Sequence, residues 1–254
     1  MKKTLDLPSL RPQSWEMFNE LAPTYQRLNS WLTFGIERLW RKTLFKAITK
    51  DFSQNLNKGP FHFLDLACGP GDLAIPLAKL YPASKITAMD LSEGMMNIGR
   101  DYIKKQKIQN VFFHLGDAQN IPVGPAAFDA VTIGFGIRNF PDPKKALREI
   151  ARCLKPEGKL YILECAVPEN LFLKKGFLLY FRHILPFLGK SLSKHPYAYQ
   201  YLNETVEEFP ARDKFWNFFE EVSPLRPLTF QNLTFGSAVF YQAVKQSSLT
   251  LKNQ

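Results

Sequence analysis

The sequence predicts an α/β protein built on a mostly parallel β-sheet. Apolar strands alternate with helix-like segments through the middle of the chain, and the first strand runs directly into a glycine-rich turn. Such alternation favours a parallel sheet with helices on both faces. A length of 254 residues suits one large core, so we expect a single domain over residues 1–254.

The first strand–helix–strand unit carries a nucleotide-binding pattern. Its parts are a strand at Phe61–Ala67, a turn at Cys68–Asp72, a helix at Leu73–Leu80 and a strand at Lys85–Met89 that ends in Asp90. Glycines at positions 69 and 71 let the backbone approach a ligand closely, because no Cβ is in the way. A carboxylate at the tip of the next strand can accept both hydroxyls of a ribose. We therefore expect an adenosine-type ligand.

The acidic residues around this turn indicate which nucleoside is bound. Gly69–Ala74 also fits the dinucleotide pattern G-x-G-x-x-A, but a dinucleotide needs an open helix N-terminus for its pyrophosphate. We expect Asp72 to cap that helix and to repel phosphates, and Asp65 adds a further negative charge. These acids suit a cationic ligand, and S-adenosylmethionine carries a sulfonium and an amino group.

A third acidic strand end completes the pattern. The strand Val111–Leu115 leads into Gly116, Asp117 and Ala118, where a carboxylate and the adjoining amide can read the adenine edge. The alternative is that each Asp only caps a turn. Acids at 65, 90 and 117 favour a Rossmann-like class I S-adenosylmethionine-dependent methyltransferase fold.

The remaining elements extend this fold. We expect helices at Ser92–Lys105 and Asp142–Leu154, strands at Phe128–Phe135 and Lys159–Cys165, and a terminal antiparallel hairpin of Thr229–Leu233 and Ala238–Val244 around Phe235–Gly236. Residues 1–58 and 167–210 are not needed for the sheet. We expect them to form a helical substrate cap.

Composition bears on the compartment and the partners. The three cysteines form no metal-type spacing and read as reduced thiols of a cytoplasmic protein, and we expect no metal.

Net charge is +10, and Leu171–Phe187 mixes large apolar side chains with cations. That mixture predicts a helix on the inner membrane surface, the alternative being a core helix with a solvated basic edge. No RNA-binding motif is evident, so nucleic acid is not expected as a partner.

Several motifs resemble the ubiquinone/menaquinone biosynthesis C-methyltransferase family. They are Phe135–Asn139 (F-G-I-R-N), Arg152–Gly158 with Glu164, Tyr25–Asn29 with Phe34–Trp40, and Tyr199–Glu204, and the similarity runs from about Tyr25 to Lys245. The resemblance implies methyl transfer from S-adenosylmethionine to a ring carbon of a polyprenylated quinol. The favoured substrate is demethylmenaquinol, with a ubiquinone precursor as the alternative. Methylation of RNA or of a small molecule, and donor binding without catalysis, also stay open as functions. Both a homodimer and a monomer stay open as the oligomeric state.

The resemblance also implies cofactor contacts at particular residues. Together with those predicted from the turn itself, the set is Asp65, Gly69, Pro70, Gly71, Asp90, Leu91, Asp117, Ala118 and Gly134. The chain departs from the family at Pro70, which is usually Thr or Ser, and at Gly134, which is often Ser. Two positions that are histidine in the family are Glu37 and Tyr241 here, so no histidine role is carried over.

The chemistry of carbon methylation suggests catalytic residues. A quinol carbon attacks a methyl group best when the neighbouring hydroxyl, with an ordinary pKa of about 10, is ionised. A fixed guanidinium stabilises that anion, and Arg138 is the candidate, unless it pairs with Asp142 or Glu164. Candidate proton acceptors in the cap are Tyr199, Tyr201, His183 and His195; a water held by Arg138 is the alternative.

Overall fold

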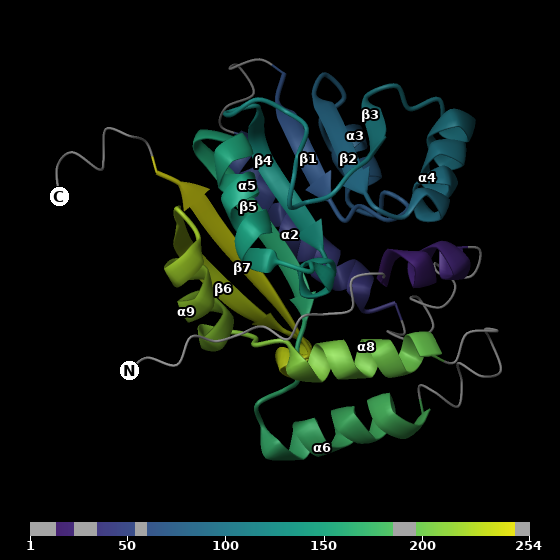
Figure 1. The fold of residues 1–254 in the computed structure, drawn as a ribbon, viewed down its shortest axis with the longest axis vertical. Helices are drawn as coiled ribbons and strands as arrows, with labels where there is room; N and C mark the ends of the chain where they lie inside the picture. The colour runs from purple at the N-terminus through teal and green to yellow at the C-terminus, as the bar shows by residue number, and fades with distance from the viewer. Residues whose placement is uncertain (1–13, 23–34, 54–59, 185–196, 247–254) are drawn as a thin grey trace, which may run out of the picture.

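The computed structural model describes residues 14–22, 35–53, 60–184 and 197–246. Within these residues a seven-stranded sheet has the order β3-β2-β1-β4-β5-β7-β6 (Figure 1). The strands are β1 (His62–Leu66), β2 (Lys85–Asp90), β3 (Val111–Leu115), β4 (Phe128–Gly134), β5 (Leu154–Cys165), β6 (Leu225–Leu233) and β7 (Ala238–Lys245). The first five strands pair in parallel, and β7 is antiparallel to both of its neighbours. The predicted fold class is confirmed.

Helices flank the sheet and extend below its carboxyl edge. They are a helix over residues 14–22, α2 (Glu37–Ser53), α3 (Ala74–Leu80), α4 (Glu93–Gln106), α5 (Pro143–Cys153), α6 (Leu171–Leu179), α8 (Tyr197–Glu208) and α9 (Asp213–Val222), with short 3-10 turns η2 (Ile137–Asn139) and η4 (Thr234–Gly236) and a π-helical turn η3 (Tyr180–Ile184). Ser92 caps α4 by accepting from the backbone N–H of Met95, as predicted.

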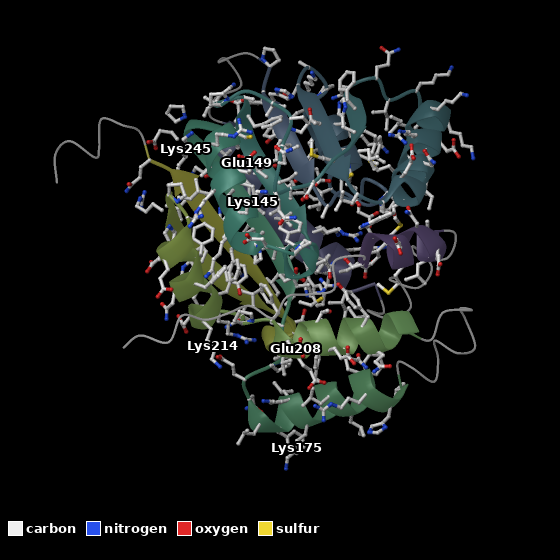
Figure 2. All side chains as sticks on the ribbon, in the orientation of Figure 1. Lys145, Glu149, Lys175, Glu208, Lys214 and Lys245 are labelled. Atoms are coloured by element: carbon white, nitrogen blue, oxygen red, sulfur yellow. The ribbon has the colours of Figure 1, made fainter. Side chains whose placement is uncertain are left out.

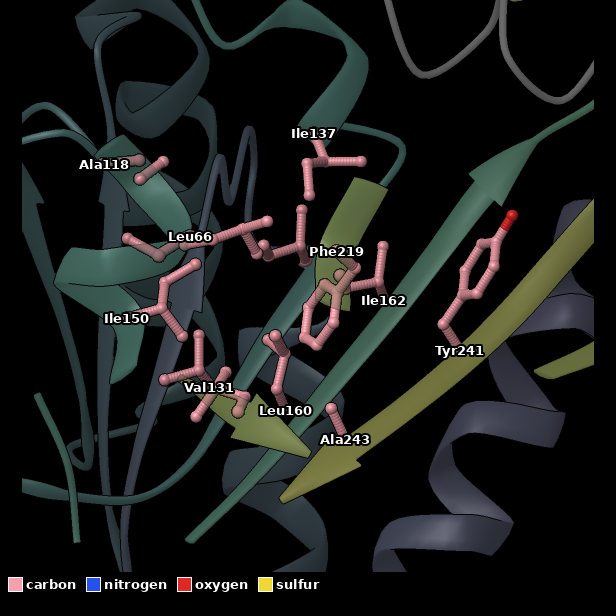
Figure 3. Close-up of a cluster of buried hydrophobic side chains, with 14 of the residues drawn as sticks. Leu66, Ala118, Val131, Ile137, Ile150, Leu160, Ile162, Phe219, Tyr241 and Ala243 are labelled. Atoms are coloured by element: carbon pink, nitrogen blue, oxygen red, sulfur yellow. The ribbon is translucent and has the colours of Figure 1, made fainter. Parts of the chain in front are cut away.

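Two apolar clusters fill the space on the two faces of the sheet. One joins the sheet to α5 and α9, and Figure 3 shows Leu66, Ile150 and Phe219 from strand and helices meeting there. The other joins it to α2 and α3 through buried residues such as Leu44 and Phe63. α2 lies in this core, so of the described residues of the predicted cap segment 1–58, those of the helix over residues 14–22 lie near the carboxyl edge.

Two strands begin earlier than the sequence predicted. β5 starts at Leu154, not Lys159, since the residues between them form an irregularity within an extended strand, with Glu157 at a φ of 63° between the two pairing registers. β6 starts at Leu225, not Thr229, and its register shifts next to Pro227. A proline is tolerated there because β6 is an edge strand and the bulge removes the need for its amide.

Candidate active site

A pocket opens at the carboxyl edge of the sheet, where β1, β2 and β4 end. It encloses about 720 Å³, counting its open mouth. Its walls are formed by Ser14, Trp15, Phe18, Leu66, Ala67, Gly69, Met89, Asp90, Leu91, Ser92, Met95, Gly116, Asp117, Ala118, Gly134, Phe135, Gly136, Asn139, Phe140 and Pro141. Six of the predicted cofactor residues are in this wall: Gly69, Asp90, Leu91, Asp117, Ala118 and Gly134.

Asp90 at the tip of β2 organises the glycine turn. One carboxylate oxygen accepts from the Gly69 N–H at 2.7 Å and the other from the Ser92 N–H at 2.8 Å. Burial raises the pKa of Asp90, while these amide donors act in the opposite direction. A carboxylate has about four acceptor positions, so two remain for the paired hydroxyls of a ribose.

Asp117 and Ala118 form the next part of the wall. The Asp117 carboxylate accepts from both the backbone and the side chain of Gln119, which fixes its direction at the end of β3. Across the pocket, a Cβ on Gly134 would lie 2.9 Å from a methyl carbon of Leu73. The glycine therefore keeps this wall thin where the family often has serine.

Asp65 lies beneath the pocket and is not part of its lining. Its side chain is buried in β1, and its two oxygens accept from the Thr132 hydroxyl at 2.8 Å and from the Ala74 N–H at 3.0 Å. Burial raises the pKa of Asp65 to about 7, against those two hydrogen bonds. Asp65 thus holds β4 and the start of α3 against β1.

The expected cap by Asp72 is wrong. Asp72 pairs with Arg41 of α2 at 2.8 Å, and Leu73 at the N-cap position of α3 receives no side-chain hydrogen bond. The Ala74 N–H at the start of α3 instead donates to Asp65 from the neighbouring strand, because α3 starts close above β1. Pro70 and Gly71 shape the turn behind the pocket wall, and Gly71 has a φ of 86°.

Two turns with left-handed backbone meet at the centre of the pocket edge. Ala67, after β1, and Phe135, after β4, have φ values of 51° and 59°. A Cβ on Gly136 would lie 2.5 Å from the Cβ of Ala67, so only glycine lets the turns approach this closely. Unfavourable backbone at adjacent strand ends is typical of sites where surrounding packing fixes a functional geometry.

Arg138 does not face the pocket; it forms a buried ion pair behind it. Its guanidinium donates to the Glu164 carboxylate at 2.5 Å and to the Phe135 carbonyl at 2.6 Å. The two side chains are 7% and 1% exposed. Burial lowers the pKa of Arg138, but Glu164 more than offsets this and raises it. The Arg138 Nε atom is buried without a hydrogen-bond partner. Of the alternatives, pairing with Glu164 is what the structure shows.

Among the predicted proton acceptors, Tyr201 of α8 reaches the site. Its hydroxyl is 2.9 Å from the Oδ1 atom of Asn139, and Asn139 lines the pocket. His183 is exposed on η3 and is not in the pocket wall. The side chain of Tyr199 and all of His195 lie outside what the structure describes.

The helix over residues 14–22 was not predicted to contact the donor site. It supplies Trp15 and Phe18 to the pocket. It is fastened by Asn19, whose Oδ1 accepts from the Ser92 hydroxyl and from the Gly94 N–H, both at 2.8 Å. The sequence signal for it is the pair of aromatic residues three positions apart, which share one face of a helix. Asn139 is the last residue of the F-G-I-R-N motif and was not predicted as a site residue.

Taken together, the pocket has a polar half and an aromatic half. Acids at the ends of β2 and β3 suit a nucleoside, and the aromatic side chains suit a flat apolar partner. Within the residues that the structure describes, no group of three or more His, Cys, Asp or Glu side chains is arranged to hold a metal ion.

Solved structures share this fold. The [4+2]-cyclase SpnF aligns with a TM-score of 0.62 at 18% identity, covering 96% of this chain and 98% of its own. An S-adenosylmethionine-dependent methyltransferase from Thermotoga maritima, described as a possible histamine N-methyltransferase, aligns with a TM-score of 0.58 at 20% identity, covering 91% and 100%. At these identities the likeness establishes the fold alone, and a cyclase and a methyltransferase both use it.

The fold and the sequence matches together define an S-adenosylmethionine-dependent methyltransferase of the class I type. The chain belongs to the ubiE/COQ5 methyltransferase family, whose model matches residues 10–245. It is 37% identical over 243 residues to the demethylmenaquinone methyltransferase of Chlorobaculum parvum, covering 96% of this chain and 97% of that one. The enzyme of that name from Bacteroides fragilis is 38% identical over 233 residues, covering 91% of each chain. The family resemblance predicted from the motifs is confirmed.

We predict that Asp90→Asn weakens binding of S-adenosylmethionine at least about tenfold, since charge-assisted hydrogen bonds contribute roughly 1.5–3 kcal/mol. Isothermal titration calorimetry measures this directly. Asp129→Asn is the matched control, because Asp129 accepts from the His62 N–H and pairs with Lys155 at the far, amino edge of the sheet. It should lose stability and keep donor affinity; an Asp90 variant with wild-type affinity would refute the ribose assignment.

We predict a pH-dependent stability difference between Asp65→Asn and the wild type. The folded pKa of about 7 lies above the ordinary value of 3.8, so the stability that Asp65 contributes is fully present below pH 3.8 and is lost as pH rises to about 7. Asn carries no titratable proton, so the variant gains on the wild type by up to about 1.4 kcal/mol per pH unit across that window. Urea unfolding at several pH values measures the difference; a constant difference would contradict the buried, protonated carboxyl.

Proposed function

We propose that this protein transfers the methyl group of S-adenosylmethionine to a ring carbon of a polyprenylated quinol, with demethylmenaquinol as the substrate. The relatives at 37% and 38% identity are named demethylmenaquinone methyltransferases, and each aligns over more than nine-tenths of its length. Methylation of 2-methoxy-6-polyprenylbenzoquinol uses the same chemistry and is the second candidate, because the family model covers the ubiE/COQ5 group as a whole.

One observation about the pocket carries the proposal: a nucleoside-binding half and an aromatic half share one cavity. We place the donor's ribose on Asp90 and its adenine beside Asp117 and Ala118, with the methionine part crossing Gly69. The aromatic half, with Trp15 and Phe18, receives the quinol ring. Such an arrangement brings the ring carbon in line with the methyl group, and positioning is the largest contribution that a methyltransferase makes.

Asn139 is the polar group placed to act on the quinol oxygen. Its Oδ1 atom is occupied by the Tyr201 hydroxyl, so its amino group is left to donate into the pocket. The quinol hydroxyl gives its proton to water, and a donor there stabilises the resulting negative oxygen, which pushes electrons toward the ortho carbon. That carbon then bonds to the methyl group, the sulfur–methyl bond breaks to leave a neutral thioether, and the ring proton departs to water.

Arg138 supports this step from behind the pocket. Through Glu164 and the Phe135 carbonyl it fixes the turn that presents Gly136 and Asn139. We therefore propose that Arg138 positions the turn and adds its field to the site, while Asn139 makes the contact with substrate.

The substrate's prenyl tail requires that the enzyme work at a membrane, and α6 is suited to that. Removing a polyprenyl chain from lipid costs about 0.8 kcal/mol per CH₂. No helix in the described residues is long and apolar enough to cross a bilayer. Figure 1 shows α6 as the outermost element beyond α8, and none of its side chains is buried.

The outer face of α6, meaning Leu171, Phe172, Lys175 and Leu179, combines apolar and cationic side chains. Leu171 is 77% and Phe172 86% exposed. Figure 2 shows Lys175 pointing away from the protein on this side. The sequence from Asn170 to Asn203 contains no Asp or Glu. Exposed apolar side chains among cations, without acids, are typical of a surface that binds anionic lipid.

The assay that tests the proposed function is incubation of the protein with S-adenosylmethionine carrying a labelled methyl group and with each reduced quinol. Mass spectrometry should find the label on the ring of demethylmenaquinol. Label only on the ubiquinone precursor would select the second candidate. Label on neither quinol, with donor binding intact, would favour a donor-binding protein without this activity.

We predict that Asn139→Leu lowers kcat by at least about tenfold with little change in donor affinity, because the lost hydrogen bond forms mainly in the transition state.

Arg138→Ala should lose about 3–5 kcal/mol of stability by leaving Glu164 unpaired. Arg138→Met with Glu164→Leu should recover stability. If the folded double variant also recovered full turnover, Arg138 would have no role in catalysis beyond holding the fold.

We predict that Lys174→Glu with Lys175→Glu weakens binding to anionic vesicles and slows methylation of a long-tailed quinol, while a short-tailed soluble analogue is spared. Sedimentation with vesicles at several salt concentrations measures binding, which should fall as salt rises. Lys104→Glu with Lys105→Glu, an exposed pair on α4, gives the same change in charge as a control. Equal losses on both quinols would instead mean that α6 supports the active site.

A further inference from the structure

The tip of the β6–β7 hairpin, Thr234–Gly236, presents an aromatic side chain to solvent on a strained backbone. Its three residues have φ values of 41°, 55° and 87°. Left-handed backbone at two consecutive non-glycine residues is unfavourable. Phe235, in the middle, is 82% exposed, so it gains almost nothing from packing within the chain. A strained backbone that projects an unburied Phe indicates a contact made outside the folded chain.

The tip is held rigidly from two sides. The Trp40 indole N–H donates to the Thr234 hydroxyl at 2.7 Å, and the buried Arg212 guanidinium donates to the Gly236 carbonyl at 2.6 Å. Glycine is favoured at position 236 because its φ of 87° is strained for other residues and a Cβ would lie 2.6 Å from that guanidinium. Because these contacts come from α2 and from the segment before α9, the projection of Phe235 is built into the fold.

The tip lies at the carboxyl edge of the sheet and adjoins the root of α6. β7 begins at Ala238, which pairs with Cys165, the last residue of β5. Arg212 also donates to the Val167 carbonyl at 3.0 Å, and Pro168 packs beside Gly236. Only two residues, Glu169 and Asn170, separate Pro168 from Leu171, where the outer face of α6 starts. Arg212 therefore joins the hairpin tip to the segment that leads into α6, which places the tip next to the start of that helix.

A short chain of contacts also links the tip to the pocket. The Trp40 ring lies 5.9 Å from the ring of Phe135, which lines the pocket, while its N–H bonds to Thr234. Leu39, the residue before Trp40, is 58% exposed. The aromatic half of the pocket is thus one side chain away from the exposed tip.

The charge around the tip identifies its partner. The hairpin from Leu225 to Lys245 contains no Asp or Glu. Arg38, beside Leu39 on the same turn of α2, has a side chain that is 74% exposed, and Lys174 and Lys175 follow on α6. Glu169, just before α6, is an exposed acid at this surface, and it lies 3.6 Å from the Nε atom of Arg212, which offsets its charge. Apolar side chains projecting from a largely cationic surface match the interface of an anionic bilayer.

We propose that the β6–β7 tip is a second membrane anchor, in which Phe235 inserts into the lipid interface beside Leu171 and Phe172. With contacts on both α6 and the hairpin, the enzyme would sit in one orientation on the bilayer, with the carboxyl edge of the sheet toward the lipid. The expectation of a membrane rests on the proposed function, but insertion of Phe235 is measured without any methyl transfer.

The test places an environment-sensitive fluorophore on Phe235→Cys. The native thiols compete only weakly with the introduced thiol at position 235 for the thiol-reactive label, because burial raises the pKa values of Cys68, Cys153 and Cys165. On vesicles of phosphatidylglycerol and phosphatidylcholine, the emission should shift to the blue and be quenched by lipids that carry a shallow quencher. Leu80→Cys is the matched control: it is exposed, and it lies at the amino edge just before β2, so its label should stay in water. A label at 235 that stays in water on vesicle-bound protein would overturn the proposal.

Unlabelled variants give a second readout. Phe235→Ser should weaken partition to these vesicles by roughly tenfold or more, and Phe235→Leu should keep most of it. Unchanged partition of Phe235→Ser to the vesicles would overturn the proposal. If sedimentation showed that this variant is a monomer where the wild type is a dimer, with unchanged partition, Phe235 would be a dimer contact and the proposal would also be overturned. Phe235→Ser should methylate a short-tailed soluble quinol normally. If the wild type failed in that reaction, the proposed function would fail while the insertion result stood.

Discussion

The buried ion pair between Arg138 and Glu164 determines the shape of the substrate side of this enzyme. It joins the turn after β4 to the end of β5, and it bonds the Phe135 carbonyl as well, so the chain cannot leave β4 in another direction. Both side chains are almost fully buried, and removing either would leave a charge in an apolar surrounding. The position of Asn139 and its bond to Tyr201 follow from where this turn is held.

Much of the donor side could be predicted from the sequence because its signals are local. Glycines, strand ends and acids within a few residues of each other predict a nucleoside site, since parallel strands bring their carboxyl ends to one edge. Asp90 and Asp117 are where the pattern places them. Asp65 and Asp72 show the limit of such reasoning. Which acid serves the start of α3 depends on how closely α3 lies over β1 and on Arg41 in α2, and neither is readable from adjacent residues.

The acceptor side could be predicted only in part, because its contacts join segments far apart in the chain. Asn19 reaches the start of α4, Tyr201 reaches Asn139, and Trp40 reaches the hairpin tip. Sequence patterns reveal faces of helices and strands, but they do not reveal which face meets which. The motif around Arg138 correctly predicted a turn at the site. The residue of that motif that faces the pocket is Asn139, however, and not Arg138.

The fastening of the helix over residues 14–22 by Asn19 has a consequence for the two ligands. The same short segment of chain, from Asp90 to Gly94, carries the proposed ribose contact on one side and anchors the helix that supplies the proposed acceptor wall on the other. A displacement of that segment by one ligand is transmitted to the surface that meets the other, with a single side chain between them. The contact made by Asn19 could therefore couple the affinities for donor and acceptor, so that binding of one changes binding of the other.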